Sequence, residues 1–249
     1  MSDAFNVMIM GETGVGKSSV VNLIAGKPIA EVNPDIESNT TKTTKYSAHI
    51  NSMTVHLWEM TGFNLPENPG AKEVFALDVD LGSVLADATT VDLVLFCMRG
   101  SKVTRTTKSM LDRIKNMFDQ VPVLLVITHL ERQKLMEDWW NDNEARLTNM
   151  GVEGTGHVCV TGLTVKKWSE KYEESRQALL MKLEQYPSCQ TRSIETCFLE
   201  YLSRMQNFNQ RGKKLEKTLR ERYKLDKTTA EKLVNVAAPE AGGFWPFNR

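Results

Sequence analysis

The nine residues GETGVGKSS, at positions 11–19, follow directly after the largely apolar run Phe5–Met10 and precede the amphipathic run VVNLIAG. The first run predicts a strand and the second predicts a helix. Glycines at positions 11, 14 and 16 let the backbone approach an anionic group closely, because they carry no Cβ atom. A glycine-rich turn that ends in Lys17 and Ser18 is the pattern of a phosphate-binding loop. The chain is therefore expected to fold around a strand–loop–helix unit.

Each part of this loop has an expected role in binding a nucleoside triphosphate. The backbone amides of residues 13–18 point toward phosphate oxygens, beside the positive end of the helix dipole. The Lys17 ammonium reaches the β- and γ-phosphates, and the Ser18 hydroxyl is a Mg²⁺ ligand. An ordinary glycine-rich turn is the alternative, which the flanking strand and helix disfavour. The residues expected to line the nucleotide are Glu12, Thr13, Gly14, Val15, Gly16, Lys17, Ser18 and Ser19.

The order of apolar runs predicts an α/β fold. Short runs alternate with amphipathic segments, which is typical of a mostly parallel sheet with helices on both faces. Two of the runs are joined by Asn51-Ser52 and are expected to form an antiparallel hairpin. The predicted strands are Phe5–Met10, Lys45–Ile50, Thr54–Met60, Asp92–Met98, Pro122–Thr128 and His157–Thr161. This P-loop domain is expected to occupy residues 1–190.

Residues 191–249 are expected to form a helical extension with a flexible aromatic end. The stripe Ile194–Phe208 has helical spacing and is either core packed on the preceding domain or a dimerisation face. The basic stretch Lys213–Lys227 contains acidic residues, which favours a solvated helix face over a membrane or nucleic-acid patch. A last helix is expected from Thr228, with the Thr228 hydroxyl as its N-cap.

Three further segments indicate which base the loop serves, since P-loops occur in ATPases, nucleotide kinases and GTPases. Glu59–Phe63 lies where GTPases place Asp-x-x-Gly, so Glu59 is expected to hold a Mg²⁺-bound water and Gly62 to meet the γ-phosphate. Thr128–Glu131 lies where GTPases place their guanine-recognition motif, and Val160–Leu163 where a backbone amide meets the base. All three follow predicted strands, where ligands of open α/β sheets bind. The expected base-binding residues are Thr128, His129, Glu131, Thr161 and Gly162.

Through these motifs the chain resembles the septin-like branch of the translation-factor class of P-loop GTPases. It is most similar to the immunity-associated (AIG1-type) GTPases and the chloroplast outer-envelope import GTPases. The resemblance rests on GETGVGKSS, TTKTT, EMTGF, THLE and the stretch from residue 96 to residue 118, and it covers about residues 4–190. It implies bound GTP or GDP, Mg²⁺, and hydrolysis that depends on a nucleotide-dependent homodimer of G domains.

The sequence departs from the family pattern at three positions. Glu59 replaces an Asp, which adds a methylene between the backbone and the carboxylate near the metal. Glu131 replaces the Asp that accepts hydrogen bonds from guanine, and His129 replaces a Lys; the resemblance implies that this His stacks on the base. Phe63 stands where Ras-like proteins place a catalytic Gln and cannot orient water, so a charge supplied in trans is expected.

The resemblance also indicates the remaining catalytic residues. Arg99 aligns best with the dimer-facing arginine of the import GTPases, while Lys102 and Arg105 remain possible. Thr41 fits the switch threonine that reaches Mg²⁺ and the γ-phosphate. Thr40 or Thr43 could hold this role in place of Thr41. The catalytic set is therefore Lys17, Thr41, Gly62 and Arg99, and the metal set is Ser18, Thr41 and Glu59.

Charge and cysteine content limit the other expectations. The 31 basic residues balance 31 acidic ones, which predicts no nucleic-acid partner. The four cysteines have no metal-ligand spacing, and no run is apolar enough to anchor the chain in a membrane. A cytoplasmic GTPase, slow as a monomer and faster as a dimer, is the expected function. A nucleotide-controlled assembly module with negligible turnover and a P-loop NTPase of relaxed base specificity are the competing functions.

Overall fold

A computed structural model describes residues 4–32, 43–60, 84–85, 88, 90–101, 103–186, 191–204 and 210–237. Its main sheet has six strands in the order β2-β3-β1-β5-β6-β7. Only β2 runs antiparallel to its neighbour, and the other pairs are parallel. The strands are β1 (Phe5–Met10), β2 (Thr44–Ile50), β3 (Met53–Glu59), β5 (Leu93–Arg99), β6 (Val123–Thr128) and β7 (Gly156–Cys159). The predicted sheet and hairpin are confirmed, with ends shifted by a residue or two.

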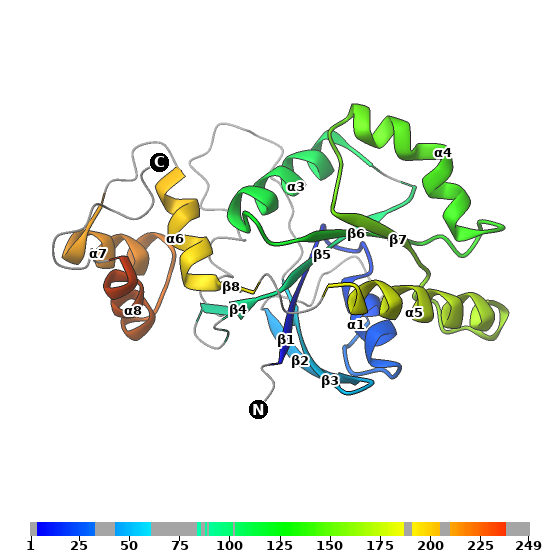
Figure 1. Ribbon diagram of the computed structural model, residues 1–249, viewed down its shortest axis with the longest axis horizontal. Coiled ribbons are helices and arrows are strands. Elements are labelled where there is room, and N and C mark those ends of the chain that lie inside the picture. The colour runs from blue at the N-terminus through cyan, green and yellow to red at the C-terminus, as the bar shows by residue number, and fades with distance from the viewer. Residues whose placement is uncertain are drawn as a thin grey trace.

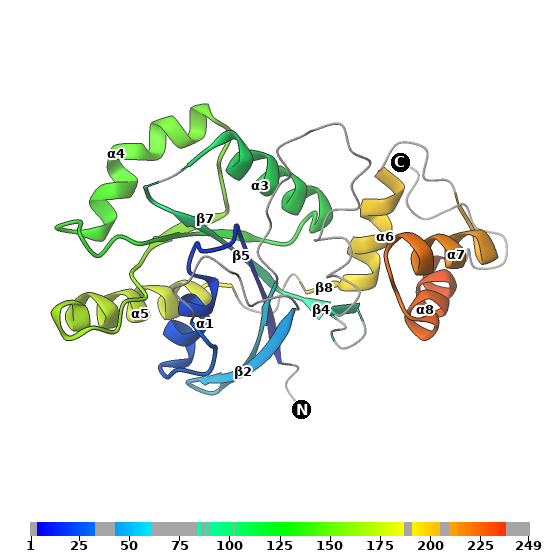
Figure 2. The ribbon, with the colours of Figure 1, turned by 180° about the vertical axis from the view of Figure 1, so that it is seen from behind.

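Helices cover both faces of this sheet (Figures 1 and 2). Helices α1 (Lys17–Ala25) and α5 (Ser169–Glu184) pack on one face, and α3 (Arg105–Met117) and α4 (Met136–Asn149) pack on the other. Each residue of β1 and of β6 is buried, because helices lie above and below these central strands. Because these strands are parallel, their carboxyl ends lie at one edge of the sheet. The predicted nucleotide-binding motifs come directly after these strand ends.

The C-terminal helices continue the core on the α3 face. Ile194, Phe198 and Leu202 of α6 (Ile194–Arg204) are buried in the cluster that contains Leu111 of α3. Arg204 of α6 donates to Asp119 Oδ2 at 2.8 Å, just beyond α3. The core interpretation of the apolar stripe is therefore confirmed for its described part. Its end at residues 205–208, like the aromatic segment 238–249, lies outside the described residues.

Three small elements within the described residues, two short strands and one 3₁₀ turn, were not predicted. Strands β4 (Thr90–Val91) and β8 (Arg192–Ser193) pair antiparallel beside α6. A 3₁₀ turn at Lys166–Trp168 precedes α5. Helix α8 (Lys227–Ala237) begins one residue before the predicted N-cap, and Asp226 Oδ1 instead accepts the Thr229 N–H at 3.0 Å. An Asp accepts such amides better than a Thr, so the predicted cap position was wrong.

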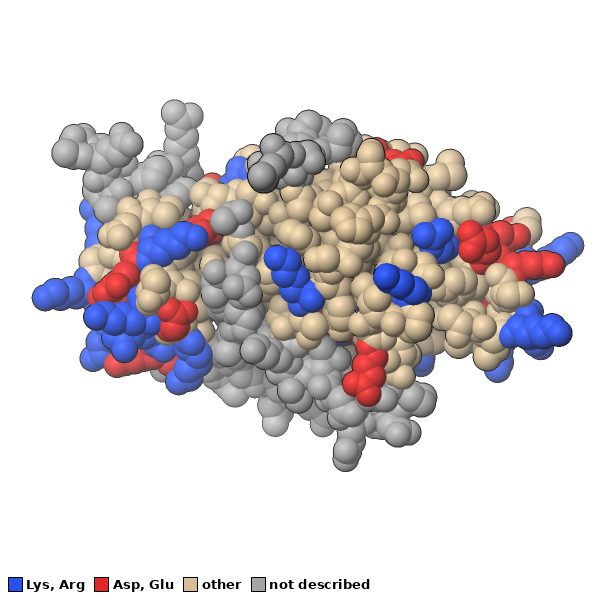
Figure 3. Space-filling view, turned by 90° about the horizontal axis from the view of Figure 1, so that it is seen from below, with Lys and Arg blue, Asp and Glu red and all other residues tan. Residues whose placement is uncertain are grey.

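The basic stretch forms α7 (Gly212–Arg222) and is a mixed-charge surface, as expected. Lys217 lies 3.9 Å from Glu221, and Arg220 lies 3.6 Å from Glu216, each one helical turn apart. Figure 3 shows blue and red side chains interspersed over this end of the molecule. No helix within the described ranges is long and apolar enough to cross a membrane.

Candidate nucleotide-binding site

The glycine-rich loop lies directly against the end of β5. Gly11 has a φ of 145°, and a Cβ atom there would stand 2.3 Å from the carbonyl oxygen of Cys97. Only glycine therefore permits this approach. Gly14 and Gly16 also have positive φ, and α1 begins at Lys17 directly after Gly16. The loop thus delivers its amides to the N-terminus of α1, which is the geometry of an anion site.

Lys17 is buried and lies over the loop that it was predicted to serve. Its exposed fraction is 6%, and its ammonium donates to the carbonyl oxygens of Gly11 and Glu12 at 3.2 and 3.1 Å. Burial lowers the pKa of Lys17, while the carboxylate of Glu59 opposes that shift. A buried cation that donates to neutral carbonyls strongly attracts phosphate oxygens.

Ser18 and Glu59, the two predicted metal ligands that lie within the described residues, are in contact. Ser18 Oγ donates to Glu59 Oε1 at 2.5 Å, and Glu59 is only 2% exposed. Burial raises the pKa of Glu59, and the hydrogen bond from Ser18 and the charge of Lys17 oppose the shift. Hydroxyl and carboxylate oxygens suit Mg²⁺, which takes few protein ligands and fills its shell with water and phosphate. Within the described residues no group of three His, Cys, Asp or Glu side chains offers another metal site.

Tyr46 of β2 is a third member of this group that sequence reasoning missed. Burial and then the charge of the Glu59 carboxylate raise the pKa of the Tyr46 hydroxyl, so the two groups lie close enough to interact. In the β2–β3 ladder Tyr46 pairs with Leu57, so it stands diagonally across from Glu59 on the same face of the sheet. The available signal was the register of the hairpin, which the Asn51-Ser52 link sets. The longer Glu side chain is thus held from two sides.

Thr128 joins the phosphate loop to the predicted base-reading segment. It is the last residue of β6 and is 4% exposed. Its hydroxyl oxygen lies 2.7 Å from Val15 O and 3.2 Å from Met98 O. The tip of β6, the end of β5 and the loop are therefore fixed relative to one another by one side chain.

His129 and Arg99 lie next to each other at the exposed edge of the site. His129 has a φ of 63°, which is uncommon for a residue other than glycine. Arg99 Nη2 lies 2.8 Å from His129 Nε2. Surrounding protein atoms and the Arg99 charge lower the pKa of His129, against the effect of Glu131. The Arg99–His129 contact therefore links the predicted base-reading segment Thr128–Glu131 to the candidate catalytic arginine.

The remaining base-binding candidates meet at the tips of β6 and β7. Glu131 Oε2 accepts from Thr161 Oγ1 at 3.4 Å. The Thr161 N–H donates to Ser175 Oγ of α5 at 2.9 Å, so this amide is already engaged. A Cβ atom on Gly162 would stand 2.5 Å from the Ser19 Cβ, which shows how closely this tip approaches α1. Gly162 is therefore the better candidate for an amide that meets the base.

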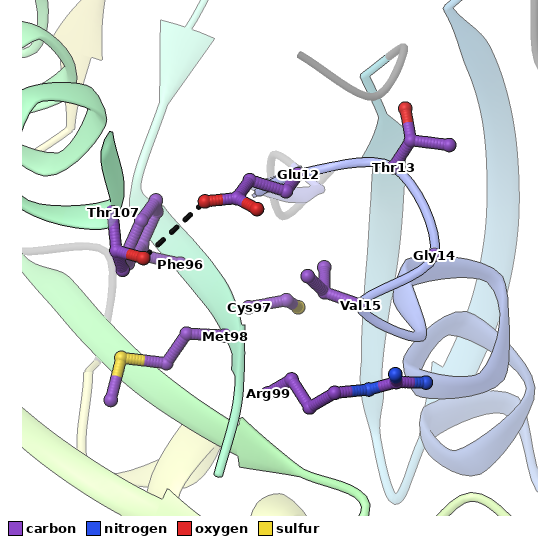
Figure 4. A pocket seen from close by; sticks show the side chains of 9 residues that line it. All are labelled: Glu12, Thr13, Gly14, Val15, Phe96, Cys97, Met98, Arg99 and Thr107. Carbon is purple, nitrogen blue, oxygen red and sulfur yellow. Dashed lines mark hydrogen bonds between the residues drawn. The ribbon is translucent and has the colours of Figure 1, made fainter. Parts of the chain in front are cut away.

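A cavity of about 100 Å³ lies between the first half of the loop and the end of β5 (Figure 4). Across it, Thr107 of α3 donates to Glu12 Oε1 at 3.3 Å. Arg99 extends from β5 toward the second half of the loop (Figure 4). The Thr13 hydroxyl oxygen is buried and has no hydrogen-bond partner in the described part of the chain. An unpartnered donor beside such a cavity fits a site for a polar ligand.

Several predicted site residues lie outside the described residues. These are Thr41 and Thr40 of the expected switch, Gly62 with the adjacent Phe63, and Lys102.

Two more candidates from the sequence do lie within the described ranges. Thr43, the third switch threonine, is buried, and its hydroxyl donates to Met60 Sδ at 3.5 Å. Arg105, a candidate for action in trans, is the exposed first residue of α3.

Comparison with known proteins agrees with this geometry. A family model described as 50S ribosome-binding GTPase matches residues 6–129. The tRNA modification GTPase MnmE of Coxiella burnetii is 29% identical over 127 residues, which are 51% of this chain and 26% of that protein. The chain thus spans about a quarter of the length of the curated relatives it matches.

Two solved structures show the same fold at low identity. A variant of Aquifex aeolicus Era bound to GDP and AlF4⁻ superposes with a TM-score of 0.54 and 14% identity, over 80% of this chain and 66% of that chain. Toc33 from Arabidopsis thaliana, in complex with GDP and Mg²⁺, gives 0.51 and 17% identity, over 76% and 87% of the two chains. The family match covers residues 6–129, about half of the chain, and that part has the fold and the phosphate loop of a P-loop GTPase domain. Within that class, the family matched is the 50S ribosome-binding GTPase family.

Proposed function

We propose that this chain binds GTP with Mg²⁺ and hydrolyses it to GDP. The observation that carries the proposal is the bond between Thr128 Oγ1 and Val15 O, which joins the base-reading segment to the phosphate loop. Both ends of one nucleotide then fall on a single edge of the sheet. We also place the chain in the septin-like, AIG1-type branch, on the motifs that carry that resemblance.

The chain's own residues divide the work of binding. Lys17 contacts the β- and γ-phosphates once it leaves the loop carbonyls, and the amides of the loop hold the remaining phosphate oxygens. Ser18 is a direct Mg²⁺ ligand, while Glu59 holds a water bound to the metal. At the other end His129 stacks on the guanine, and Glu131 accepts hydrogen bonds from its edge.

Hydrolysis needs another group to orient the attacking water and to neutralise charge on the transferring phosphoryl group, because Phe63 stands where a glutamine orients water in Ras-like proteins. We propose that two G domains pair across their nucleotides and that a basic residue of one acts on the other. Arg99 is the first candidate, followed by Lys102 and Arg105. Such a group in trans accelerates hydrolysis about 10³- to 10⁵-fold in known cases. Thr41 and Gly62 complete the γ-phosphate contacts.

The cellular setting is part of the proposal. We propose a cytoplasmic protein that forms a nucleotide-dependent homodimer, with a G domain at residues 1–190 and a helical extension at 191–249. No nucleic-acid partner is proposed, because basic and acidic residues balance at 31 each. One solved structure of Era is a complex with ribosomal RNA, but that describes Era and not this chain. Binding to RNA is therefore an outcome to test.

The test combines binding and product analysis on the same samples. The Mg²⁺-loaded protein is titrated with GTP, GDP, ATP and ADP by calorimetry, and nucleotide products are separated by chromatography. Guanine preference together with GDP release is the expected result. Equal adenine binding supports the relaxed NTPase instead. Tight GTP binding without product supports the assembly module.

Pairing is tested by the dependence of rate on protein concentration. The specific activity is expected to rise with concentration in the unmodified protein and to stay low in Arg99→Ala. Arg146→Ala, on the exposed surface of α4, is the matched control and should behave like the unmodified protein. A rate per molecule that is independent of concentration contradicts the paired mechanism.

A further inference from the structure

A continuous line of hydrogen bonds runs from Arg99 to the phosphate loop. Arg99 Nη2 lies 2.8 Å from His129 Nε2, and His129 Nδ1 lies 2.9 Å from Thr128 Oγ1. Thr128 Oγ1 lies 2.7 Å from Val15 O. Arg99 and Thr128 are partners in the parallel β5–β6 ladder, so the backbone brings the three side chains together.

Which atom donates in each of these three hydrogen bonds follows from the Arg99 guanidinium. A guanidinium has donors only, so His129 Nε2 must be the acceptor and carries no proton. The neutral ring then bears its proton on Nδ1 and donates it to Thr128 Oγ1. The Thr128 hydroxyl in turn donates to the Val15 carbonyl, which accepts only. The line is therefore complete for one protonation state, a neutral His129 with its proton on Nδ1.

Two further observations agree with a fixed, neutral ring. His129 holds a left-handed φ of 63°, a backbone conformation that a residue other than glycine adopts only where its surroundings fix it. The surroundings of the ring, with Arg99 among them, lower the pKa of His129. A neutral imidazole also presents a flat face without charge, which suits stacking on a base.

We infer that Arg99 is a positioning residue for His129 within its own subunit and thereby strengthens guanine-nucleotide binding by the single G domain. This inference rests on the proposed function, in which His129 contacts the base. It adds to any action of Arg99 on a partner. While Arg99 is bonded to His129, its guanidinium is engaged, so base reading and action in trans draw on the same side chain.

The first test reads the protonation pattern of the ring by ¹⁵N nuclear magnetic resonance. The chain has four histidines, and the loss of one signal in His129→Ala identifies the ring of interest. The unmodified protein should show the Nδ1–H tautomer. Arg99→Met keeps the side-chain length but removes the donor, so the Nε2–H tautomer should gain population. An unchanged tautomer in Arg99→Met would overturn the inference.

The second test measures GDP affinity by calorimetry with Mg²⁺, at a concentration where the protein is monomeric. Arg99→Met is expected to weaken GDP binding about 3- to 10-fold, the range for the net contribution of one hydrogen bond. Arg99→Lys should recover part of the loss, because it keeps one donor. Arg146→Ala should leave both the affinity and the tautomer unchanged.

Epistasis shows whether Arg99 acts through His129. In a His129→Ala background, Arg99→Met should have no further effect on GDP affinity. An equal loss in both backgrounds would mean that Arg99 acts independently of the ring and would overturn the inference. Failure of the proposed function looks different. In that case the unmodified protein neither binds GDP nor releases it from GTP, while the tautomer of His129 is still measurable.

Discussion

Ser18 Oγ donates a 2.5 Å hydrogen bond to Glu59 Oε1, in a place where the carboxylate is almost fully buried. The hydroxyl belongs to the first turn of α1 and the carboxylate to the end of β3, so the bond ties the start of the helix to the sheet. The Glu59 side chain, which is one methylene longer than that of an Asp, thus reaches Ser18 directly.

Glu59→Gln should weaken Mg²⁺ binding in the GDP complex. The amide keeps the shape but removes the charge, and the loss of such an outer-sphere partner typically lowers metal affinity about 10- to 100-fold. The measurement is a Mg²⁺ titration of GDP release. Glu144→Gln, at an exposed position of α4, is the matched control. A Mg²⁺ dependence like that of the control would remove Glu59 from the metal site.

Tyr46→Phe should weaken Mg²⁺ binding by a smaller factor, about 2- to 10-fold, because it removes a hydroxyl that interacts with the Glu59 carboxylate. The same Mg²⁺ titration measures it. Tyr172→Phe is the control, since the Tyr172 hydroxyl donates instead to Asn22 O at 3.5 Å, at the other end of α1. If both variants shift the titration equally, Tyr46 does not act through Glu59.

Thr128→Val should weaken GDP binding about 10-fold. Valine matches the shape of threonine but leaves the Val15 and Met98 carbonyls without their side-chain donor, which is costly in a buried place. Thr128→Ser keeps the hydroxyl and should bind GDP nearly as well as the unmodified protein. Calorimetry with GDP and Mg²⁺ distinguishes the two. Equal affinities in Val and Ser variants would show that the hydroxyl plays no part.

The sequence predicts the strands and loops that carry this site, because the residue patterns that indicate them are local. Runs such as Phe5–Met10 and Pro122–Thr128 have the apolar content of strands buried on both faces. Once those strands are parallel, their carboxyl ends must share an edge. The loop after Met10 and the segment after Ile127 then lie at the same edge of the sheet, and the structure places them on either side of β5.

The side-chain contacts within the site could not be predicted from such local patterns. The Arg99–His129 bond depends on which side-chain rotamers two adjacent strand ends adopt, and Tyr46 depends on a diagonal across a hairpin. Strands β4 and β8 have two residues each, too few for any periodic signal, and they pair across about a hundred positions of sequence. Such features arise from tertiary packing, so only the structure reveals them.

Glu195 in α6 is expected to stabilise the C-terminal helices in a pH-dependent way. Its carboxylate is buried and contacts Lys232 Nζ of α8 at 2.5 Å and Ser193 Oγ at 2.6 Å. Burial alone raises the pKa of Glu195, but these hydrogen bonds outweigh it, so the pKa lies below its ordinary value. The stabilisation is therefore present above the unfolded-state pKa and is lost as the pH falls through the folded-state pKa.

Glu195→Gln should accordingly lower the free energy of unfolding by about 1.5–3 kcal/mol at pH 7, the range for hydrogen bonds to a charged group. The difference from the unmodified protein should shrink as the pH falls below about 4.3, the ordinary pKa of Glu, and vanish below the folded-state pKa, where the carboxyl group is protonated in both states. Urea unfolding followed by circular dichroism at pH 7 and pH 3 measures both values. Glu231→Gln breaks only the exposed 3.6 Å pair with Lys227 and should cost less than about 0.5 kcal/mol. A Glu195→Gln effect that persists undiminished at pH 3 would assign the loss to packing and would contradict the charged contact with Lys232.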